Sequence, residues 1–200
     1  MVEFLKNFLT MWIVKPFKRF PYFGRFRFWC LYLAYRLTGW HIRHKEWDFI
    51  LEYLPKLMKG QEVQVLDFGA GRNLLGFEIL GRGYLYSGID LEGGYDGLDI
   101  IKGDMRKTTW NQVADFVICV SVIEHVEGDF GQSDSIKNMV YSLKPGGRLL
   151  LTCPTHEFAQ GHPWHGFNLK EIEDMLPSNA VIYEYTERVG QICVCIGKNA

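Results

Sequence analysis

Only a few folds accommodate the pattern that runs from Glu62 to the C-terminus, in which short apolar runs alternate with helix-like stretches. The apolar runs read VQVLDF, LYSGID, DIIKGD, DFVICV and RLLLTCP, and each reaches a polar or glycine-bearing end. Strands that are apolar along most of their length and are separated by helices are typical of a parallel sheet covered on both faces. We therefore expect strands at residues 63–68, 85–90, 99–104, 115–120 and 148–154, and helices over 73–80, 133–143 and 169–175.

The last two apolar runs, residues 180–189 and 191–198, are joined by a very short connection at Gly190. A parallel crossover needs a dozen residues or more, so these two runs must pair as an antiparallel hairpin. The pattern therefore predicts an α/β fold with a mostly parallel seven-stranded sheet and an antiparallel C-terminal hairpin.

Residues 1–60 differ from the rest of the chain because they are dense in aromatic side chains. Apolar residues recur at helical spacing over residues 4–13, a second helix is expected over 26–37, and a third apolar stripe covers 47–57. Pro16 and Pro21 interrupt the pattern between the first two helices. We expect an aromatic, basic, helical N-terminal extension over residues 1–60 and one domain over 61–200.

The charge of the chain is unevenly distributed, although its net value is −1. Residues 1–40 carry seven lysines and arginines against one acid, a balance of +6 that leaves −7 for the remaining residues. A basic, aromatic arm suits contact with an anionic surface, and we expect residues 1–40 to lie at a membrane surface. The alternative is a solvated basic face. Residues 41–58 are instead expected to pack across the sheet and to cap the ligand pocket.

The expected location is the cytoplasm, at the inner face of a membrane. No signal peptide is recognisable, and the apolar runs FLTMWIV and FWCLYLAY are shorter than the ~20 residues that span a bilayer. The five cysteines form no CxxC pair, and all but Cys30 lie in apolar runs, where a free thiol behaves as a small hydrophobe. A reducing compartment fits this usage best.

The strongest local motif is VLDFGAGRN, residues 65–73, where an apolar strand ends in Asp67 and a glycine turn leads into a helix. Gly69 and Gly71 let the backbone approach a ligand closely. Leu74 occupies the third glycine position of the dinucleotide pattern G-x-G-x-x-G, and Asp67 would repel a pyrophosphate. The same acid would attract a cation, such as the ammonium or sulfonium of S-adenosylmethionine. The alternative is that Asp67 caps the following helix.

D-x-G-x-G after a strand resembles the first motif of class I S-adenosylmethionine-dependent methyltransferases. Further fragments follow in that family's order: GID at 88–90, KGDM at 102–105, ADFVICVSVIEHV at 114–126 and LKPGGRLLL at 143–151. The resemblance is to the small-molecule, methyltransferase type 11-like branch, and it covers about residues 62–198. It implies a Rossmann-like three-layer sandwich. It also implies that S-adenosylmethionine is held by Asp67, Gly69, Ala70, Gly71, Asp90, Leu91, Asp104, Met105 and Val120.

Within that resemblance, Asp67, Gly69 and Gly71 would hold the methionine end, Asp90 the ribose and Asp104 the adenine edge. One feature departs from the family pattern. Only LEGGYDGLD separates Asp90 from the third strand, which is too short for the usual intervening helix. Glu92 therefore remains an alternative ribose ligand, and Asp99 an alternative adenine ligand. Asp104 has a further alternative role, as the start of a turn.

Histidines concentrate after the fourth and fifth strands, where an α/β sheet faces its ligand crevice. Four of the six histidines stand at positions 125, 156, 162 and 165, next to Phe158, Trp164 and Phe167. A general base is needed only if the methyl acceptor has a proton to lose, and His125 and His156 are the candidates. We expect Glu124, His162, Trp164 and His165 to contact the acceptor. A chance surface cluster is the alternative, and for Glu124 and His125 a role in capping or orienting their loop is a further alternative.

A metal is not expected. Glu124, His125 and His165 loosely resemble the metal ligands of small-RNA 2′-O-methyltransferases, but Ser121 stands where those enzymes carry their leading glutamate. The loss of one carboxylate would weaken a site for a hard cation. A nucleic-acid substrate is not expected either, because the body is acidic and contains no recognisable RNA-binding module.

The sequence therefore predicts an enzyme that transfers a methyl group from S-adenosylmethionine, by in-line displacement, to a small or lipid-linked acceptor. One alternative is a non-catalytic protein that keeps this fold and binds a membrane or a partner. A nicotinamide-dependent oxidoreductase is the other alternative. The acceptor atom and the oligomeric state are not determined by the sequence.

Overall fold

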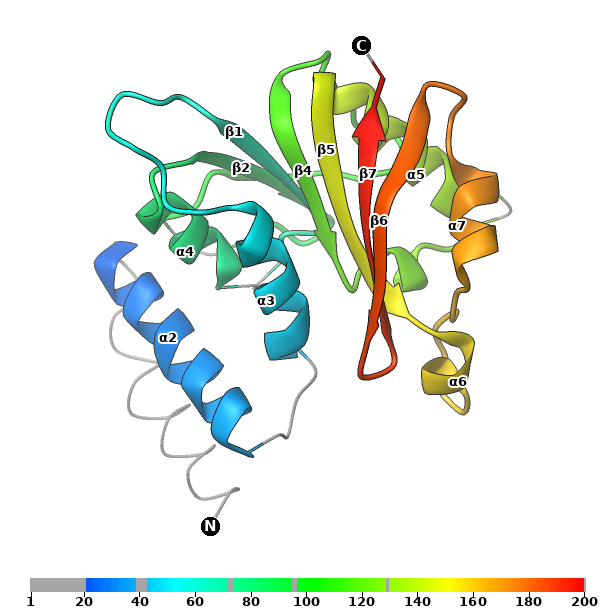
Figure 1. Cartoon of the computed structure of the whole chain (residues 1–200), viewed down its shortest axis with the longest axis horizontal. Helices are drawn as coiled ribbons and strands as arrows, with labels where there is room; N and C mark the ends of the chain where they lie inside the picture. The colour runs from blue at the N-terminus through cyan, green and yellow to red at the C-terminus, as the bar shows by residue number, and fades with distance from the viewer. Residues whose placement is uncertain (1–20, 39–42, 72–73, 95–96, 129, 200) are drawn as a thin grey trace.

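The computed structural model describes residues 21–38, 43–71, 74–94, 97–128 and 130–199 (Figure 1). Its centre is a seven-stranded sheet in the order β3-β2-β1-β4-β5-β7-β6. The strands are β1 Gln64–Phe68, β2 Leu85–Asp90, β3 Ile100–Lys102, β4 Ala114–Val120, β5 Leu143–Pro154, β6 Ala180–Arg188 and β7 Gln191–Lys198. Strands β1 to β5 pair in parallel, whereas β7 is antiparallel to both β5 and β6. The predicted mixed sheet and its C-terminal hairpin are confirmed.

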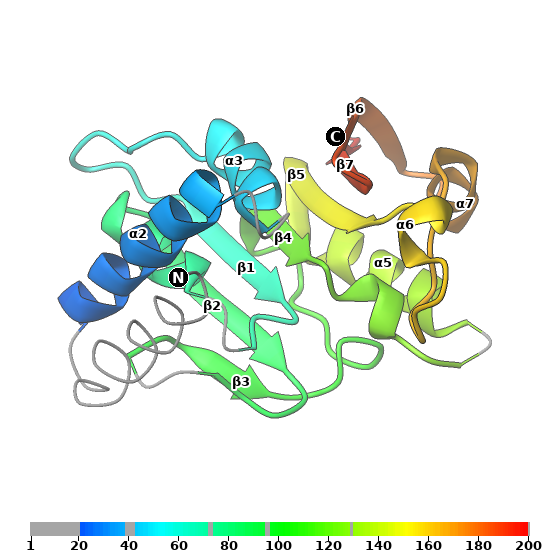
Figure 2. The same ribbon diagram turned by 90° about the horizontal axis from the view of Figure 1, so that it is seen from below.

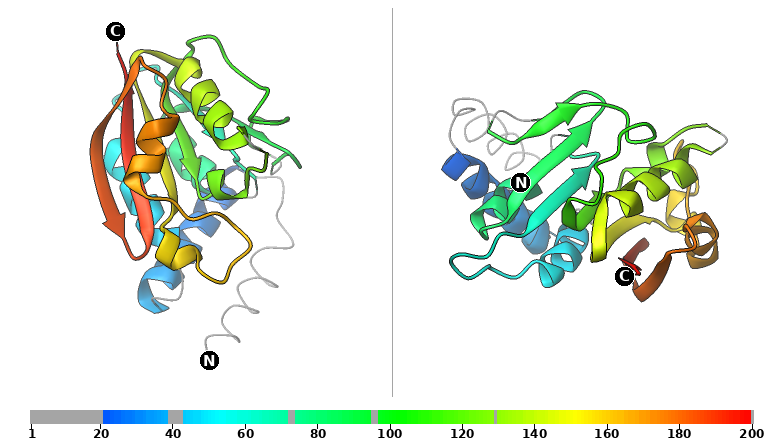
Figure 3. Two further views of the ribbon diagram at one scale, coloured as in Figure 1. Left: turned by 90° about the vertical axis from the view of Figure 1, so that its right-hand side faces the viewer. Right: turned by 90° about the horizontal axis from the view of Figure 1, so that it is seen from above.

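Two groups of helices cover the faces of the sheet. The helices are α2 Pro21–Thr38, α3 Arg43–Tyr53, α4 Leu75–Gly81, the 3-10 turn η2 Ile123–His125, α5 Gly131–Ser142, α6 His156–Ala159 and α7 Leu169–Met175. Helices α2, α3 and α4 lie on one face, and α5 and α7 lie on the other, as Figures 2 and 3 show. This is the three-layer sandwich that the sequence predicts.

An apolar core lies on each face of the sheet, and neighbouring residues of one strand contribute side chains to the two cores alternately. This explains why the strands are apolar along most of their length. In β1, Val65 packs with the α2–α4 group and Leu66 packs with the α5–α7 group. In β4, Ile118 and Val117 divide in the same way. Successive strand side chains point to opposite faces, so a sheet covered on both sides needs apolar residues at both odd and even positions of each strand.

The N-terminal helices belong to the first of these cores. Phe28 of α2 is fully buried and its ring lies 4.8 Å from that of Trp47 of α3, between centroids. Trp47, Ile50 and Leu54 share this core with strand residues Val65 and Leu150, so the expected packing across the sheet is confirmed. The described residues of 41–58 do not cap the pocket, because none of them belongs to the lining of the cavity described below. Helix α2 begins earlier than expected, at Pro21, because proline is well tolerated in the first turn of a helix. The helix expected over 4–13 lies outside the described residues.

The sheet order places one natural crevice in the molecule. Strand β1 pairs with β2 on one side and with β4 on the other, so the chain reverses its direction of winding at β1. Open α/β sheets bind ligands outside the carboxyl ends of their strands at such a point.

None of the described helices is long and apolar enough to cross a membrane.

Candidate cofactor site

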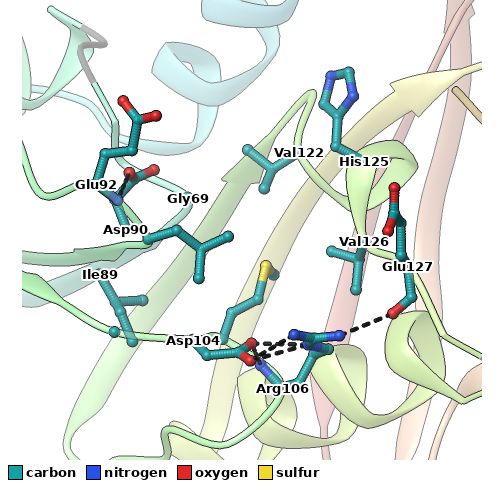
Figure 4. Close-up of a pocket in the computed structure, with 13 residues that line it drawn as sticks. Gly69, Ile89, Asp90, Glu92, Asp104, Arg106, Val122, His125, Val126 and Glu127 are labelled. Carbon is teal, nitrogen blue, oxygen red and sulfur yellow. Dashed lines mark hydrogen bonds and ion pairs between the residues drawn. The ribbon is translucent and has the colours of Figure 1, made fainter. Parts of the chain in front are cut away.

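A cavity of about 540 Å³ lies beside the carboxyl ends of β1, β2 and β4. Four chain segments line it: Gly69 after β1, residues 89–92 at the end of β2, residues 103–106 after β3, and Val122 with residues 125–127 after β4. Figure 4 shows these side chains around the opening. The cavity therefore occupies the position that the sheet order predicts for a ligand site.

The turn after β1 is hydrogen-bonded to the end of β2. The amides of Gly69 and Ala70 both donate to the carbonyl of Ile89, at 2.8 and 3.0 Å. Gly69 has φ +81°, and a Cβ there would lie 2.4 Å from the side chain of Val122. At Gly71, with φ +45°, a Cβ would lie 3.3 Å from Asp90 Oδ2. Glycine is therefore required at position 69, and it leaves bare backbone at the wall of the cavity.

Asp67 lies behind this turn rather than in the cavity wall. It is 1% exposed, and its Oδ2 accepts a hydrogen bond of 2.7 Å from the hydroxyl of Tyr86. Burial raises the pKa of Asp67 to about 7; the Tyr86 hydrogen bond opposes this shift, and the charge of Asp90 adds to it. Asp67 does not cap helix α4, whose N-cap is Leu74, so the capping alternative is wrong.

Asp90 and Glu92, the two candidate ribose ligands, both line the cavity. Asp90 is held in place because its Oδ1 accepts from the amide of Glu92 at 2.9 Å, and its carbonyl accepts from Gly103 at 2.9 Å. Asp99, the alternative adenine ligand, accepts instead from Ser87 Oγ at 2.8 Å and is not part of the lining. The described connection between β2 and β3 contains no helix, as its length predicts.

Asp104 is engaged by a residue that the sequence reasoning missed. The Arg106 guanidinium donates to both carboxylate oxygens of Asp104 at 2.7–3.0 Å, and its Nη1 reaches the carbonyl of Glu127 at 3.1 Å (Figure 4). The hydrogen bonds that Arg106 donates to Asp104 lower the pKa of the Asp104 carboxyl. Arg106 thus joins the two loops that form one side of the cavity. Its place two residues after Asp104 was the only sequence signal for it.

The two predicted bases lie at different places. His125 lines the cavity, and its ring meets that of Trp164 edge-on at 5.7 Å. His156 lies on α6 outside the lining, where its Nε2 is 2.7 Å from Glu171 Oε2 of α7. Only His125 therefore stands next to the cavity.

The histidine-rich loop reaches the cavity through His125. Trp164 stacks on His162 with ring centroids 4.1 Å apart and planes 8° apart. The amide of His165 donates to the carbonyl of Glu124 at 3.2 Å, which attaches the loop to the η2 turn. None of residues 156–165 belongs to the lining, so the loop adjoins the cavity through His125 rather than forming its wall.

The structure divides the sequence-predicted site residues into two groups. Those that line the cavity are Gly69, Asp90, Leu91, Asp104, Met105 and His125. Those outside the lining are Asp67, Ala70, Gly71, Val120, Glu124, His156, His162, Trp164 and His165. Lining residues without an expected role are Ile89, Gly103, Arg106, Val122, Val126 and Glu127. Val120 points into the α2–α4 core, and Val122, two residues further on, faces the cavity instead.

Glu124, His125 and His165, which resemble metal ligands in sequence, lie near the η2 turn. Among the residues that the structure describes, no three His, Cys, Asp or Glu side chains gather into a group that could hold a metal ion. Glu124 and His165, two of the three weighed for that role, meet through backbone atoms.

Comparisons with known proteins give the fold but not the acceptor. No protein-family model matches the sequence, and no curated protein matches it. Solved structures do match. An S-adenosylmethionine-dependent methyltransferase from Clostridium acetobutylicum gives a TM-score of 0.62 at 12% identity, over 88% of this chain and 100% of its own. The chain has the class I methyltransferase fold.

Two further neighbours with this fold contain S-adenosylhomocysteine. The 1,6-didemethyltoxoflavin-N1-methyltransferase of Burkholderia thailandensis gives a TM-score of 0.62 at 15% identity, over 88% of this chain and 87% of its own. The N-methyltransferase NodS of Bradyrhizobium japonicum gives 0.61 at 13% identity, over 80% and 91%. At such identities the likeness extends to the class I methyltransferase fold alone.

Proposed function

We propose that this chain binds S-adenosylmethionine in the cavity and transfers its methyl group to an acceptor. The observation that carries the proposal is the convergence of Gly69, Asp90 and Asp104 on one cavity at the point where the sheet reverses its winding. These residues come from three separate strand ends. A glycine turn with acids around it suits a ligand that carries an ammonium, a sulfonium and a ribose diol.

Each part of the cofactor has a proposed partner. The bare backbone of Gly69 faces the methionine end, Ala70 and Gly71 continue the same turn outside the lining, and buried Asp67 supplies negative charge behind it. Asp90 accepts from the ribose hydroxyls, with Glu92 as its neighbour on the same wall.

The remaining proposed contacts lie around the adenine ring. Leu91 and Met105 provide apolar surface in the lining, and Val120 supports the wall from the core. Asp104, oriented by Arg106, is the proposed contact for the edge of the adenine ring.

Methyl transfer needs positioning above all. The acceptor's lone pair forms a bond to the methyl carbon while the carbon–sulfur bond breaks. The electron pair of the broken bond stays on the sulfur. If the acceptor atom carries a proton, His125 is the base that we propose, because it lines the cavity. His156 takes second place, since it is paired with Glu171 outside the cavity.

The proposed acceptor site lies beside His125, where the histidine-rich loop adjoins the cavity. Trp164 and His162 form a stacked pair beside His125, and Glu124 and His165 link the loop to η2. An acceptor held there would meet aromatic surface at one end and the sulfonium at the other. The acceptor is a small molecule or a lipid-linked one.

Titration calorimetry tests the cofactor directly. We expect the full chain to bind S-adenosylmethionine and S-adenosylhomocysteine and to give no heat with NADH. Asp90→Ala should weaken both interactions at least tenfold, a loss of about 1.4 kcal/mol. Binding of NADH alone would indicate an oxidoreductase. Absence of binding to all three ligands would favour a non-catalytic partner-binding protein.

A membrane location at the inner, cytoplasmic face is a separate part of the proposal. Helix α2 exposes Phe26, Leu33 and Leu37 by 54, 55 and 77%. This apolar stripe continues a segment that is basic in sequence, and the combination suits anionic headgroups. Co-sedimentation with vesicles of anionic lipid tests it: the chain should pellet, and Leu33→Lys with Leu37→Lys should leave it in the supernatant. Wild-type protein that stays in the supernatant would rule out this contact.

A further inference from the structure

Glu46 of α3 is a fully buried carboxylate that reaches the carboxyl ends of two central strands. Its exposed fraction is 0%. Oε1 accepts a hydrogen bond from the hydroxyl of Ser121, the residue directly after β4, and another of 2.7 Å from Thr152 Oγ1 in β5. One carboxylate therefore links a helix of the N-terminal region to the edge of the sheet where the cavity lies. Burial of a carboxylate is costly, which makes a purely incidental contact a poor explanation.

Ser121 has the backbone conformation that most needs support in this turn. Its φ is +50°, in the left-handed region that side chains other than glycine rarely adopt. Its amide donates to the carbonyl and to Oγ1 of Thr152, both at 3.1 Å. The hydrogen bond from its hydroxyl to Glu46 holds the side chain, so both the backbone and the side chain of Ser121 are fixed by hydrogen bonds. Loss of that bond would remove part of what maintains the left-handed conformation.

The conformation of Ser121 decides where the next residues point. Val122 lines the cavity and lies against Gly69, at a distance that leaves no room for a Cβ on the glycine. The amide of His125 donates to the carbonyl of Val122 at 2.9 Å, so His125 follows the same turn. Two walls of the cavity, the β1 turn and the β4 turn, therefore meet at Val122.

We infer that Glu46 is a positioning residue for the cofactor cavity. Through Ser121 it holds the turn that presses Val122 against Gly69 and places His125 in the cavity lining. Glu46 itself touches no ligand, because it is buried behind the turn. The affinity part of this inference rests on the proposed binding of S-adenosylmethionine.

The test compares Glu46→Ala with Glu46→Gln, which keeps an oxygen acceptor for the two hydroxyls. By calorimetry, Glu46→Ala should bind S-adenosylhomocysteine about tenfold more weakly than the wild type, equivalent to about 1.4 kcal/mol. Glu46→Gln should restore the affinity to within about twofold, since it restores the hydrogen bonds. Glu78→Ala is the matched control, because Glu78 is a buried acid of the same helical layer that lies outside the cavity. It should lower the melting temperature and keep the affinity.

A double-mutant cycle examines the route through Ser121. Glycine adopts positive φ without strain, so in a Ser121→Gly background the effect of Glu46→Ala on affinity should shrink to about twofold. An undiminished tenfold effect in that background would exclude the route. An unchanged affinity in Glu46→Ala, or an equal loss in Glu78→Ala, would overturn the inference and leave Glu46 as a stabilising residue only.

A ligand-free measurement separates this inference from the proposed function. Amide hydrogen exchange of Ser121, His125 and Val126 should be faster in Glu46→Ala than in Glu46→Gln or Glu78→Ala. The Ser121 amide bonds to Thr152 of β5 and the other two amides bond within the turn, so all three depend on the turn keeping its conformation. If the wild type binds no S-adenosylhomocysteine, the proposed function fails while this measurement still decides the positioning role. Equal exchange in all three variants would exclude it.

Discussion

Gly69 is the residue at which backbone conformation and close packing coincide. Its φ is +81°, and a Cβ added there would lie only 2.4 Å from Val122. Gly69→Ala should therefore lower the free energy of unfolding by about 2–4 kcal/mol, from backbone strain plus overpacking. It should also raise the dissociation constant for S-adenosylhomocysteine more than tenfold. Urea denaturation and calorimetry measure the two effects.

Gly60→Ala is the control for Gly69→Ala. Gly60 has a similar φ, +92°, but a Cβ there would meet nothing within 4 Å. The Gly60→Ala variant should have the same kind of backbone strain as Gly69→Ala but keep the affinity for the cofactor. Equal loss of affinity in both variants would show that strain, rather than contact with Val122, is responsible.

Asp67 should make the stability of the free protein depend on pH. Burial raises its pKa to about 7 from 3.8, so between about pH 4 and pH 7 the folded state binds a proton that the unfolded state has lost. The free energy of unfolding contributed by this group therefore falls as pH rises through that window and stays low above it. Urea denaturation at pH 5 and pH 7.5 should show a smaller decrease in Asp67→Asn. An identical decrease in both proteins would contradict the assignment.

The same linkage extends to the cofactor. A bound ammonium favours ionised Asp67, so binding below about pH 7 should release a proton, and affinity should rise with pH up to that value. Calorimetry at pH 6 in two buffers of different ionisation enthalpy measures the release. Asp67→Asn should release none at this group.

At the scale of elements, Glu78 joins the helices of one layer. From α4 it accepts hydrogen bonds from Arg25 Nε at 2.7 Å, Trp29 Nε1 at 3.0 Å and Arg82 Nε at 3.0 Å. Arg82 in turn donates to two carbonyls at the end of α3, at 2.9 and 2.6 Å. One buried acid thus connects α2, α3 and α4, which explains why the basic residue Arg25 of α2 points toward the protein rather than away from it.

Removal of Glu78 should destabilise this layer strongly. Glu78→Ala leaves Arg82, whose side chain is 18% exposed, without its acidic partner, and we expect a loss of about 3 kcal/mol in the free energy of unfolding. Asp174→Ala, which breaks the exposed pair with Lys170, should leave the urea midpoint unchanged. Similar losses in both variants would argue against Glu78 as the link between helices.

At the scale of the whole molecule, the N-terminal helices complete one of two cores. Phe28, Trp47 and Ile50 are buried against the same face of the sheet as Val65 and Leu150. The predicted division at residue 60 remains a prediction about domains, but the apolar contacts cross it.

A chain that begins at residue 61 should therefore fail to fold cooperatively. It exposes the sheet face that α2 and α3 cover, and we expect aggregation and no thermal transition in near-ultraviolet circular dichroism. A chain that begins at Pro21 keeps every described core residue and should retain the transition. A cooperative transition in the shorter chain would show that residues 61–200 form an independent domain.

The sequence was sufficient for the strands and for much of the cavity. Strands β2 and β7 and helix α7 lie at the residues that periodicity predicts, and the hairpin follows from the shortness of its connection. Gly69 was recognisable from the glycine turn after an apolar strand, and Asp90 and Asp104 from the resemblance of their strand ends to the motifs of class I methyltransferases. Helix α6 was not expected, since a single turn of four residues has no periodicity to detect.

Contacts between distant segments were decided by the tertiary structure alone. Glu46 lies 75 residues from Ser121 and 106 from Thr152 in sequence, and nothing near any of the three indicates that they meet. His125 and His156 read alike in sequence, yet only the former reaches the cavity. Apolar periodicity and turn residues act through neighbours along the chain, so the sequence determined the elements, the sheet and its acidic glycine turn. Which side chains complete the cavity depends on how the helices pack across the sheet, and that is set only when distant apolar faces are buried together.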